Sequence, residues 1–196
     1  MLFSILSQIN WVDIAVISLF IRILYVAAKN GFIIELFKLI GVVVTIYISL
    51  HYYSALAGLL IKRTGVQQYP VVFVEYFIFL LLVLGTYGFF ILLRTLFFNF
   101  VKMEAIPALS KWGGFVLGFF RAFLASSLVV CVLALSTIPY FSGSAAKSYW
   151  GESLYNTAVS TYSFFWNGVM SKFMVHEKFN EDILEVKTFS AKRDSR

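Results

Sequence analysis

The amino-acid sequence predicts an all-α integral membrane protein with four transmembrane helices, a C-terminal interfacial amphipathic helix and a charged tail. Hydrophobic residues make up 60% of the chain and charged residues 13%. Four long apolar stretches account for most of the 196 residues, and each is close to the roughly 20 residues that cross a bilayer as a helix. Because backbone groups in lipid must be hydrogen-bonded within the protein, we expect these stretches to be helical.

The four stretches are predicted at residues 9–28, 36–53, 71–93 and 113–138. The third stretch argues most strongly against a water-soluble helical bundle, because residues 76–93 include no charged side chain. A soluble helix of that length would present polar side chains to water on every turn. We therefore expect residues 1–139 to form a four-span membrane bundle.

The composition changes after residue 139 and again after residue 176. In residues 140–176, mostly apolar and aromatic side chains recur at helical spacing, namely Trp150, Leu154, Tyr155, Ala158, Tyr162, Phe165, Val169 and Phe173. This pattern predicts an amphipathic helix that lies either in the membrane interface or against the outer mouth of the bundle. Residues 177–196 contain five acidic and five basic side chains, so we expect a solvated charged tail.

The lysine and arginine residues near the span ends predict how the bundle is oriented. The connections after spans one and three carry Lys29, Lys38, Arg94, Lys102 and Lys111, and the opposite side carries Lys62, Arg63 and Lys147. Because cytoplasmic loops are enriched in positive charge, we expect both chain termini outside. The formal charge of +6 lies close to the membrane, which suits anionic lipid head groups better than nucleic acid.

Four charged residues fall in the cytoplasmic half of the spans and form a candidate intramembrane cluster: Arg22, Glu35, Arg94 and Arg121. A charge near the centre of a transmembrane helix costs at least about 2.5 kcal/mol unless it finds a partner, water or the interface. The three guanidinium groups can converge on an anion, with Glu35 held by one of them. Alternatively, Glu35 pairs with one arginine while the others extend to the lipid head groups.

Two carboxylates, Asp13 and Glu75, are predicted in the first turn of helices that enter the membrane from outside. A helix N-terminus favours negative charge, so capping is the simplest role, and a proton-coupled role is the alternative. The two histidines, His51 and His176, have no ligand spacing with each other or with Cys131, so we expect no metal site and no cofactor. Since no nucleophile is paired with a base, we expect no enzymatic activity.

Small residues recur every four positions on two spans and predict where helices approach closely. They are Gly114, Gly118, Ala122 and Ser126 on the fourth span, and Gly41, Thr45 and Ser49 on the second. We expect these two faces to pack against each other, which would place Arg121 near Glu35. The same faces can instead form the contact between copies in a homo-oligomer.

Three short segments carry a resemblance to a known family. They are Asn-Trp-Val-Asp-Ile at 10–14, Lys-Asn-Gly-Phe-Ile-Ile-Glu at 29–35 with Gly41 after it, and Gly-Gly-Phe-Val-Leu-Gly-Phe-Phe-Arg at 113–121. In order and spacing they resemble the colicin V production protein (CvpA) family of bacteria. The resemblance implies a multi-pass protein of the bacterial inner membrane, needed for production or export of the toxin colicin V.

The sequence leaves two function classes open besides the enzyme class that it disfavours. In the first, the bundle is an accessory factor that anchors the amphipathic helix and the tail for an export or envelope protein. In the second, the protein is a small-solute or anion transporter or channel, in which several copies use the charged cluster as an anion site. An open, water-accessible cluster would favour transport, and arginines dispersed toward lipid would favour the accessory role.

Overall fold

The computed structural model describes residues 9–64, 70–100, 107–174 and 177–184, and those residues contain no strand. Four of the described helices are long and apolar enough to cross a membrane. They are α2 (Trp11–Lys29), α3 (Phe32–Thr64), α4 (Val71–Phe100) and α5 (Pro107–Ala134). After them come α6 (Pro139–Lys147), α7 (Gly151–Phe165), the π-helical turn η1 (Trp166–Met170), α8 (Ser171–Phe173) and the 3-10 turn η2 (Glu181–Ile183). The predicted all-α membrane fold is confirmed.

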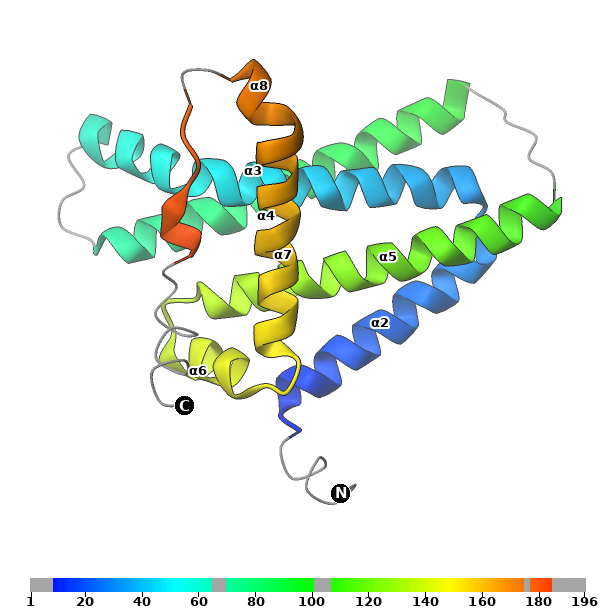
Figure 1. The fold of residues 1–196 in the computed structure, drawn as a ribbon, viewed down its shortest axis with the longest axis horizontal. Coiled ribbons are helices and arrows are strands. Elements are labelled where there is room, and N and C mark those ends of the chain that lie inside the picture. Colours follow the sequence, from blue (N-terminus) through cyan, green and yellow to red (C-terminus); the bar gives the residue numbers. More distant parts are fainter. Residues whose placement is uncertain (1–8, 65–69, 101–106, 175–176, 185–196) are drawn as a thin grey trace.

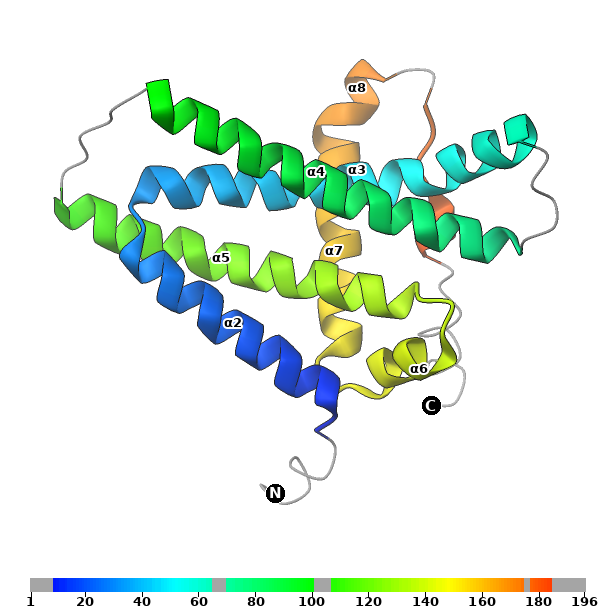
Figure 2. The same ribbon diagram turned by 180° about the vertical axis from the view of Figure 1, so that it is seen from behind.

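The four long helices lie side by side in an order that differs from their order in the chain. Helix α5 packs between α2 and α3, and α4 packs on the other side of α3 (Figures 1 and 2). Helix α7 crosses this layer and packs on α3 and α5, so it runs across the direction of the spans. A helix in that direction lies along the plane of a membrane that the four long helices cross.

All four predicted spans differ from the helices at one end or both, by one residue to eleven; α4, for example, continues to Phe100 instead of ending at residue 93. Helix α3 has 33 residues, or about 50 Å at 1.5 Å per residue, which exceeds the roughly 30 Å of a hydrocarbon core. The predicted span 36–53 is therefore too short, because the helix continues to Thr64. At the same end of the bundle, α5 stops at Ala134 rather than at residue 138, since Pro139 disfavours helical backbone just before it and starts α6 instead.

The core of the protein lies where α7 meets α3 and α5. Leu154, Tyr155, Ala158 and Tyr162 of α7 are all buried there, with Leu50 of α3. The central part of the predicted aromatic stripe therefore faces the bundle, whereas its ends at Trp150 and Phe173 are exposed. The single helix predicted over 140–176 is also wrong, because the chain turns at residues 148–150 and α7 ends in the π-helical turn η1.

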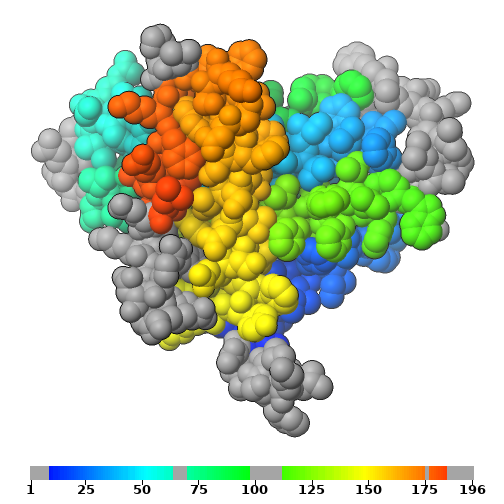
Figure 3. All heavy atoms as spheres, viewed as in Figure 1, coloured from blue at the N-terminus to red at the C-terminus, as the bar shows by residue number. Residues whose placement is uncertain are grey.

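The first part of the predicted tail is not free in solvent. Ile183 is completely buried, and the Phe179 ring packs against Tyr162 with 4.9 Å between ring centroids. Residues 177–184 thus return to the bundle and lie beside α7 on the same face of the molecule (Figures 1 and 3). We call α7 and residues 177–184 together the outer platform. His176, Lys102 and the tail beyond residue 184 lie outside the described residues.

Candidate functional site

Glu35 occupies the first turn of α3 and is completely buried. Its Oε1 accepts hydrogen bonds from Asn30 Nδ2 at 2.7 Å and from Lys38 Nζ at 2.8 Å. Its Oε2 lies 3.0 Å from Nε of Arg121, which is buried on α5. Two cations and one amide therefore surround a single carboxylate, which offsets part of the cost of placing that charge away from water.

Glycine residues allow α5 to come close enough for this contact. A Cβ atom at Gly118 would overlap the Cβ of Ala27 on α2, and one at Gly114 would stand 2.7 Å from the carbonyl oxygen of Asn30. Both positions therefore require the absence of a side chain. Arg121 lies three residues after Gly118, so this close approach brings its side chain to the start of α3.

The glycines of the two small-residue faces contact other partners than the ones predicted. Gly114 and Gly118 contact α2 and the turn between α2 and α3, whereas Gly41 faces Phe90 of α4, whose Cβ is 3.0 Å from an added Cβ. Thr45 and Ser49 are buried and donate to carbonyl oxygens of their own helix. Ala122 and Ser126 are likewise buried. The spacing identified the close contacts, but it held no information on which helix supplies each partner.

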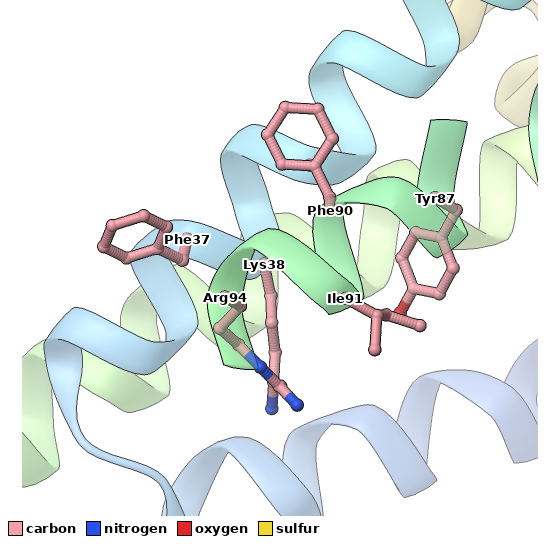
Figure 4. Close-up of a pocket in the computed structure, with 7 residues that line it drawn as sticks. Phe37, Lys38, Tyr87, Phe90, Ile91 and Arg94 are labelled. Carbon is pink, nitrogen blue, oxygen red and sulfur yellow. The ribbon is translucent and has the colours of Figure 1, made fainter. Parts of the chain in front are cut away.

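Three of the four residues of the predicted charge cluster, Glu35, Arg94 and Arg121, lie near one another, and Arg22 is not part of that group. Arg121 is paired with Glu35, Arg22 is exposed on α2, and Arg94 is half-buried beside Lys38 in a pocket between α3 and α4 (Figure 4). Lys38 belongs to the network and was missed as a site residue. Its position three residues after Glu35 on one helix face was the signal that could have identified it.

Asp13 joins the start of α2 to the start of α7. It is completely buried and forms a capping box with Asn10, whose backbone N–H donates to Asp13 Oδ2 at 2.9 Å. The Ser148 hydroxyl donates to Oδ1 at 2.6 Å, and the backbone N–H groups of Tyr149 and Trp150 donate at 3.2 and 3.1 Å. The carboxylate therefore caps its own helix and also fixes the turn that leads into α7.

Glu75 does not take the position predicted for it. It is the fifth residue of α4, past the first turn, and it is half-buried. The helix begins at Val71, directly after Pro70, so the first turn is made of apolar residues. Glu75 therefore does not cap the helix as the sequence suggested.

His51 on α3 holds the second end of the outer platform. Its Nδ1 lies 2.8 Å from the Tyr162 hydroxyl and its Nε2 lies 2.7 Å from Glu177 Oε2. The backbone N–H of Asn180 donates to the same Tyr162 oxygen at 3.0 Å, and the Asn180 side chain donates to the Leu50 carbonyl oxygen at 2.7 Å. Burial raises the pKa of Tyr162, so its hydroxyl stays protonated and available to donate.

The arrangement thus contains two buried polar networks at different places on α3. The first, around Glu35, ties α3 to α5 near the turn between α2 and α3. The second, around His51, ties residues 177–184 to α3 and α7. Within the described residues, no group of three His, Cys, Asp or Glu side chains could hold a metal ion.

Comparison with known proteins agrees with the sequence segments described above. The family model described as colicin V production protein matches residues 12–162, which includes the four long helices and most of α7. Asp13, Glu35 and Arg121 all lie within that match. No curated protein and no solved structure matches the chain. Because the family model covers more than half of the sequence, the chain belongs to the colicin V production protein family.

Proposed function

We propose that the protein is an accessory factor in colicin V production or export, located in the bacterial inner membrane with both termini outside. In this role the four-span bundle anchors the outer platform as a binding surface for an export or envelope protein. The role requires no catalytic group, cofactor or nucleic acid. The bundle fixes the position of the outer platform, and the platform provides the surface that binds the partner protein.

The observation that carries the proposal is the attachment of the outer platform at both of its ends. Asp13 binds the turn that begins α7, and His51 binds Glu177 where the chain returns. Between these points the buried face of α7 packs on α3 and α5. Two helices of the bundle therefore hold one surface segment in a fixed place, which is what a binding platform needs.

The exposed face of α7 has the chemistry of a polar binding surface. A shallow groove of about 480 Å³ runs along it, lined by Ser153, Asn156, Thr157, Ser160, Thr161 and Phe164. These residues recur at helical spacing, none is charged, and all except Phe164 carry a hydroxyl or amide group. Such a surface can form hydrogen bonds with a protein partner without the desolvation cost of burying charges.

The placement of the arginines also supports the accessory role over transport. Arg121 is held in a buried pair with Glu35, and Arg22 is exposed on α2. An anion path would need these guanidinium groups to face one water-filled space. Arginines that are paired or dispersed fit a structural bundle.

Toxin release by a colicin V-producing strain tests the proposal. The strain lacks its own copy of the corresponding gene and carries this chain, either as the parent or with Asn156→Arg or Ser160→Arg on the exposed face of α7. We expect each variant to reach the membrane at the parent level and to lower secreted colicin V about tenfold, as loss of an interface hot spot does. Ser142→Arg on α6 adds the same charge outside the platform and should leave release unchanged. Equal release by all four proteins would contradict the proposal.

A further inference from the structure

The side of the bundle that carries the turn between α2 and α3 holds more positive than negative charge. Lys38, Arg94 and Arg121 lie close enough together for their charges to interact, and Glu35 is the carboxylate among them. Three positive charges less one negative charge leave a formal surplus of two. Glu35 contacts Lys38 and Arg121. Among the described residues, Arg94 has no ion pair of its own.

The pocket between α3 and α4 presents this surplus to a ligand. Lys38 and Arg94 line it, and their side chains extend in the same direction so that their nitrogen atoms lie near each other (Figure 4). The pocket has a volume of about 20 Å³, which holds a single water-sized group. A ligand that binds here must therefore insert one small polar group and keep the rest of its volume outside.

An apolar track leads away from the pocket along α4. Leu84, Tyr87, Ile91 and Arg94 follow each other at spacings of three or four residues, so they share one helix face. Leu84, Tyr87 and Ile91 are 70%, 38% and 44% exposed. The ten residue steps from Leu84 to Arg94 cover about 15 Å, which is half of a hydrocarbon core and the depth of one leaflet.

We propose that the α3–α4 pocket binds an anionic phospholipid, with a phosphate oxygen between Lys38 and Arg94 and an acyl chain along Ile91, Tyr87 and Leu84. Arginine and lysine are the usual ligands of phosphate, and basic pockets between transmembrane helices bind lipid head groups. The small pocket and the long apolar track together select a lipid over a free phosphate. The site is separate from the outer platform, so its existence does not depend on the proposed accessory role.

Binding of two lipids with identical acyl chains tests the charge requirement. The full chain, purified in neutral detergent, is titrated with dioleoyl phosphatidylglycerol or dioleoyl phosphatidylcholine, and bound lipid is counted by native mass spectrometry. We expect about tenfold tighter binding of phosphatidylglycerol, the effect of one hydrogen bond to a charged group. Equal binding of the two lipids by the parent chain would overturn the proposal, and this comparison requires no variant.

Removing one cation assigns the binding to the pocket. Arg94→Gln should weaken phosphatidylglycerol binding about tenfold and leave phosphatidylcholine binding unchanged. Arg22→Gln removes the same charge from an exposed position on α2 and should bind phosphatidylglycerol within about twofold of the parent. If Arg94→Gln binds phosphatidylglycerol as tightly as the parent, the lipid does not bind in this pocket. The same conclusion follows if Arg22→Gln weakens phosphatidylglycerol binding as much as Arg94→Gln does.

A third arm separates a lipid from a free phosphate. Glycerol phosphate has the phosphate chemistry without the acyl chains, and it should fail to displace phosphatidylglycerol at millimolar concentration. Complete displacement would mean that the acyl track contributes nothing and would overturn the lipid assignment. Ile91→Gln should weaken phosphatidylglycerol binding although Lys38 and Arg94 are unchanged. If this variant binds phosphatidylglycerol as tightly as the parent, the acyl chain does not lie along the apolar track of α4.

Discussion

Glu35 is stable inside the bundle because Asn30, Lys38 and Arg121 all approach its carboxylate. Glu35→Gln removes the negative charge and leaves two cations together at a site with little access to water. Breaking a buried pair in this way costs about 3 to 5 kcal/mol. We expect a lower thermal unfolding midpoint and a lower yield of monodisperse protein, both measured by size-exclusion chromatography after heating in detergent.

Glu75→Gln is the matched control for that change, because Glu75 is half-buried and no ion pair is assigned to it within the described part of the chain. It should keep the parent midpoint. Replacing both Glu35 and Arg121 with glutamine should recover part of the loss, since the buried guanidinium is then gone and only the partly exposed Lys38 keeps a charge at the site. A Glu35→Gln protein as stable as the parent would show that the pair does not hold α3 to α5.

Gly118 offers a second test at the scale of one residue. Gly118→Ala adds a methyl group that would overlap Ala27 of α2, so the two helices must separate. Overpacking of this kind costs about 1 to 3 kcal/mol. Gly85→Ala on α4 adds the same group where nothing lies within 4 Å, and it should be neutral. Thermal unfolding in detergent compares the two, and equal midpoints would contradict the close approach of α5 to α2.

At the residue scale, the sequence shows that a buried charge needs a partner, but it does not show which residue that partner is, because helix rotation determines it. A buried carboxylate needs a cation, so the existence of a partner for Glu35 could be expected. The choice among Arg22, Arg94 and Arg121 depends on how each helix is rotated, and apolar helices that face lipid on several sides carry no pattern that fixes this rotation. For the same reason the sequence could not show that Gly118 faces Ala27 rather than Gly41.

At the scale of the elements, Asp13 links the start of α2 to the turn that leads into α7. Asp13 accepts from the Ser148 hydroxyl and from the backbone of Tyr149 and Trp150. Asp13→Asn removes the charge and replaces one acceptor oxygen with a donor. We expect faster deuterium exchange in residues 148–158, with unchanged exchange in residues 36–53. If residues 148–158 exchange deuterium at the same rate in the variant and in the parent, Asp13 does not hold the start of α7.

The sequence predicted the long helices better than it predicted how the C-terminal part folds back. Long uncharged stretches identify membrane helices by length alone, and this part of the prediction is confirmed. The equal numbers of acidic and basic residues after residue 176 suggested a solvated tail. Yet Ile183 and Phe179 pack against α7, and Asn180 bonds to α3. A few apolar and amide side chains decide that docking, and overall composition does not reveal them.

At the scale of the whole molecule, the two polar networks lie at different positions along α3. The network around Glu35 lies at the end of the bundle with the turn between α2 and α3, and the network around His51 lies farther along α3, beside α7, which crosses the layer of long helices (Figures 1 and 2). The predicted orientation places the end with this turn in the cytoplasm and the platform outside. An export or envelope partner can reach the platform only in that orientation.

Cysteine labelling of intact cells measures this orientation most directly. In a Cys131→Ala background, a single cysteine replaces either Lys29, exposed at the end of α2, or Asn156, exposed on α7. A membrane-impermeant maleimide should label the cysteine at 156 in intact cells and the cysteine at 29 only after lysis. Labelling of position 29 in intact cells, with position 156 reached only after lysis, would place the outer platform in the cytoplasm and contradict the proposed role.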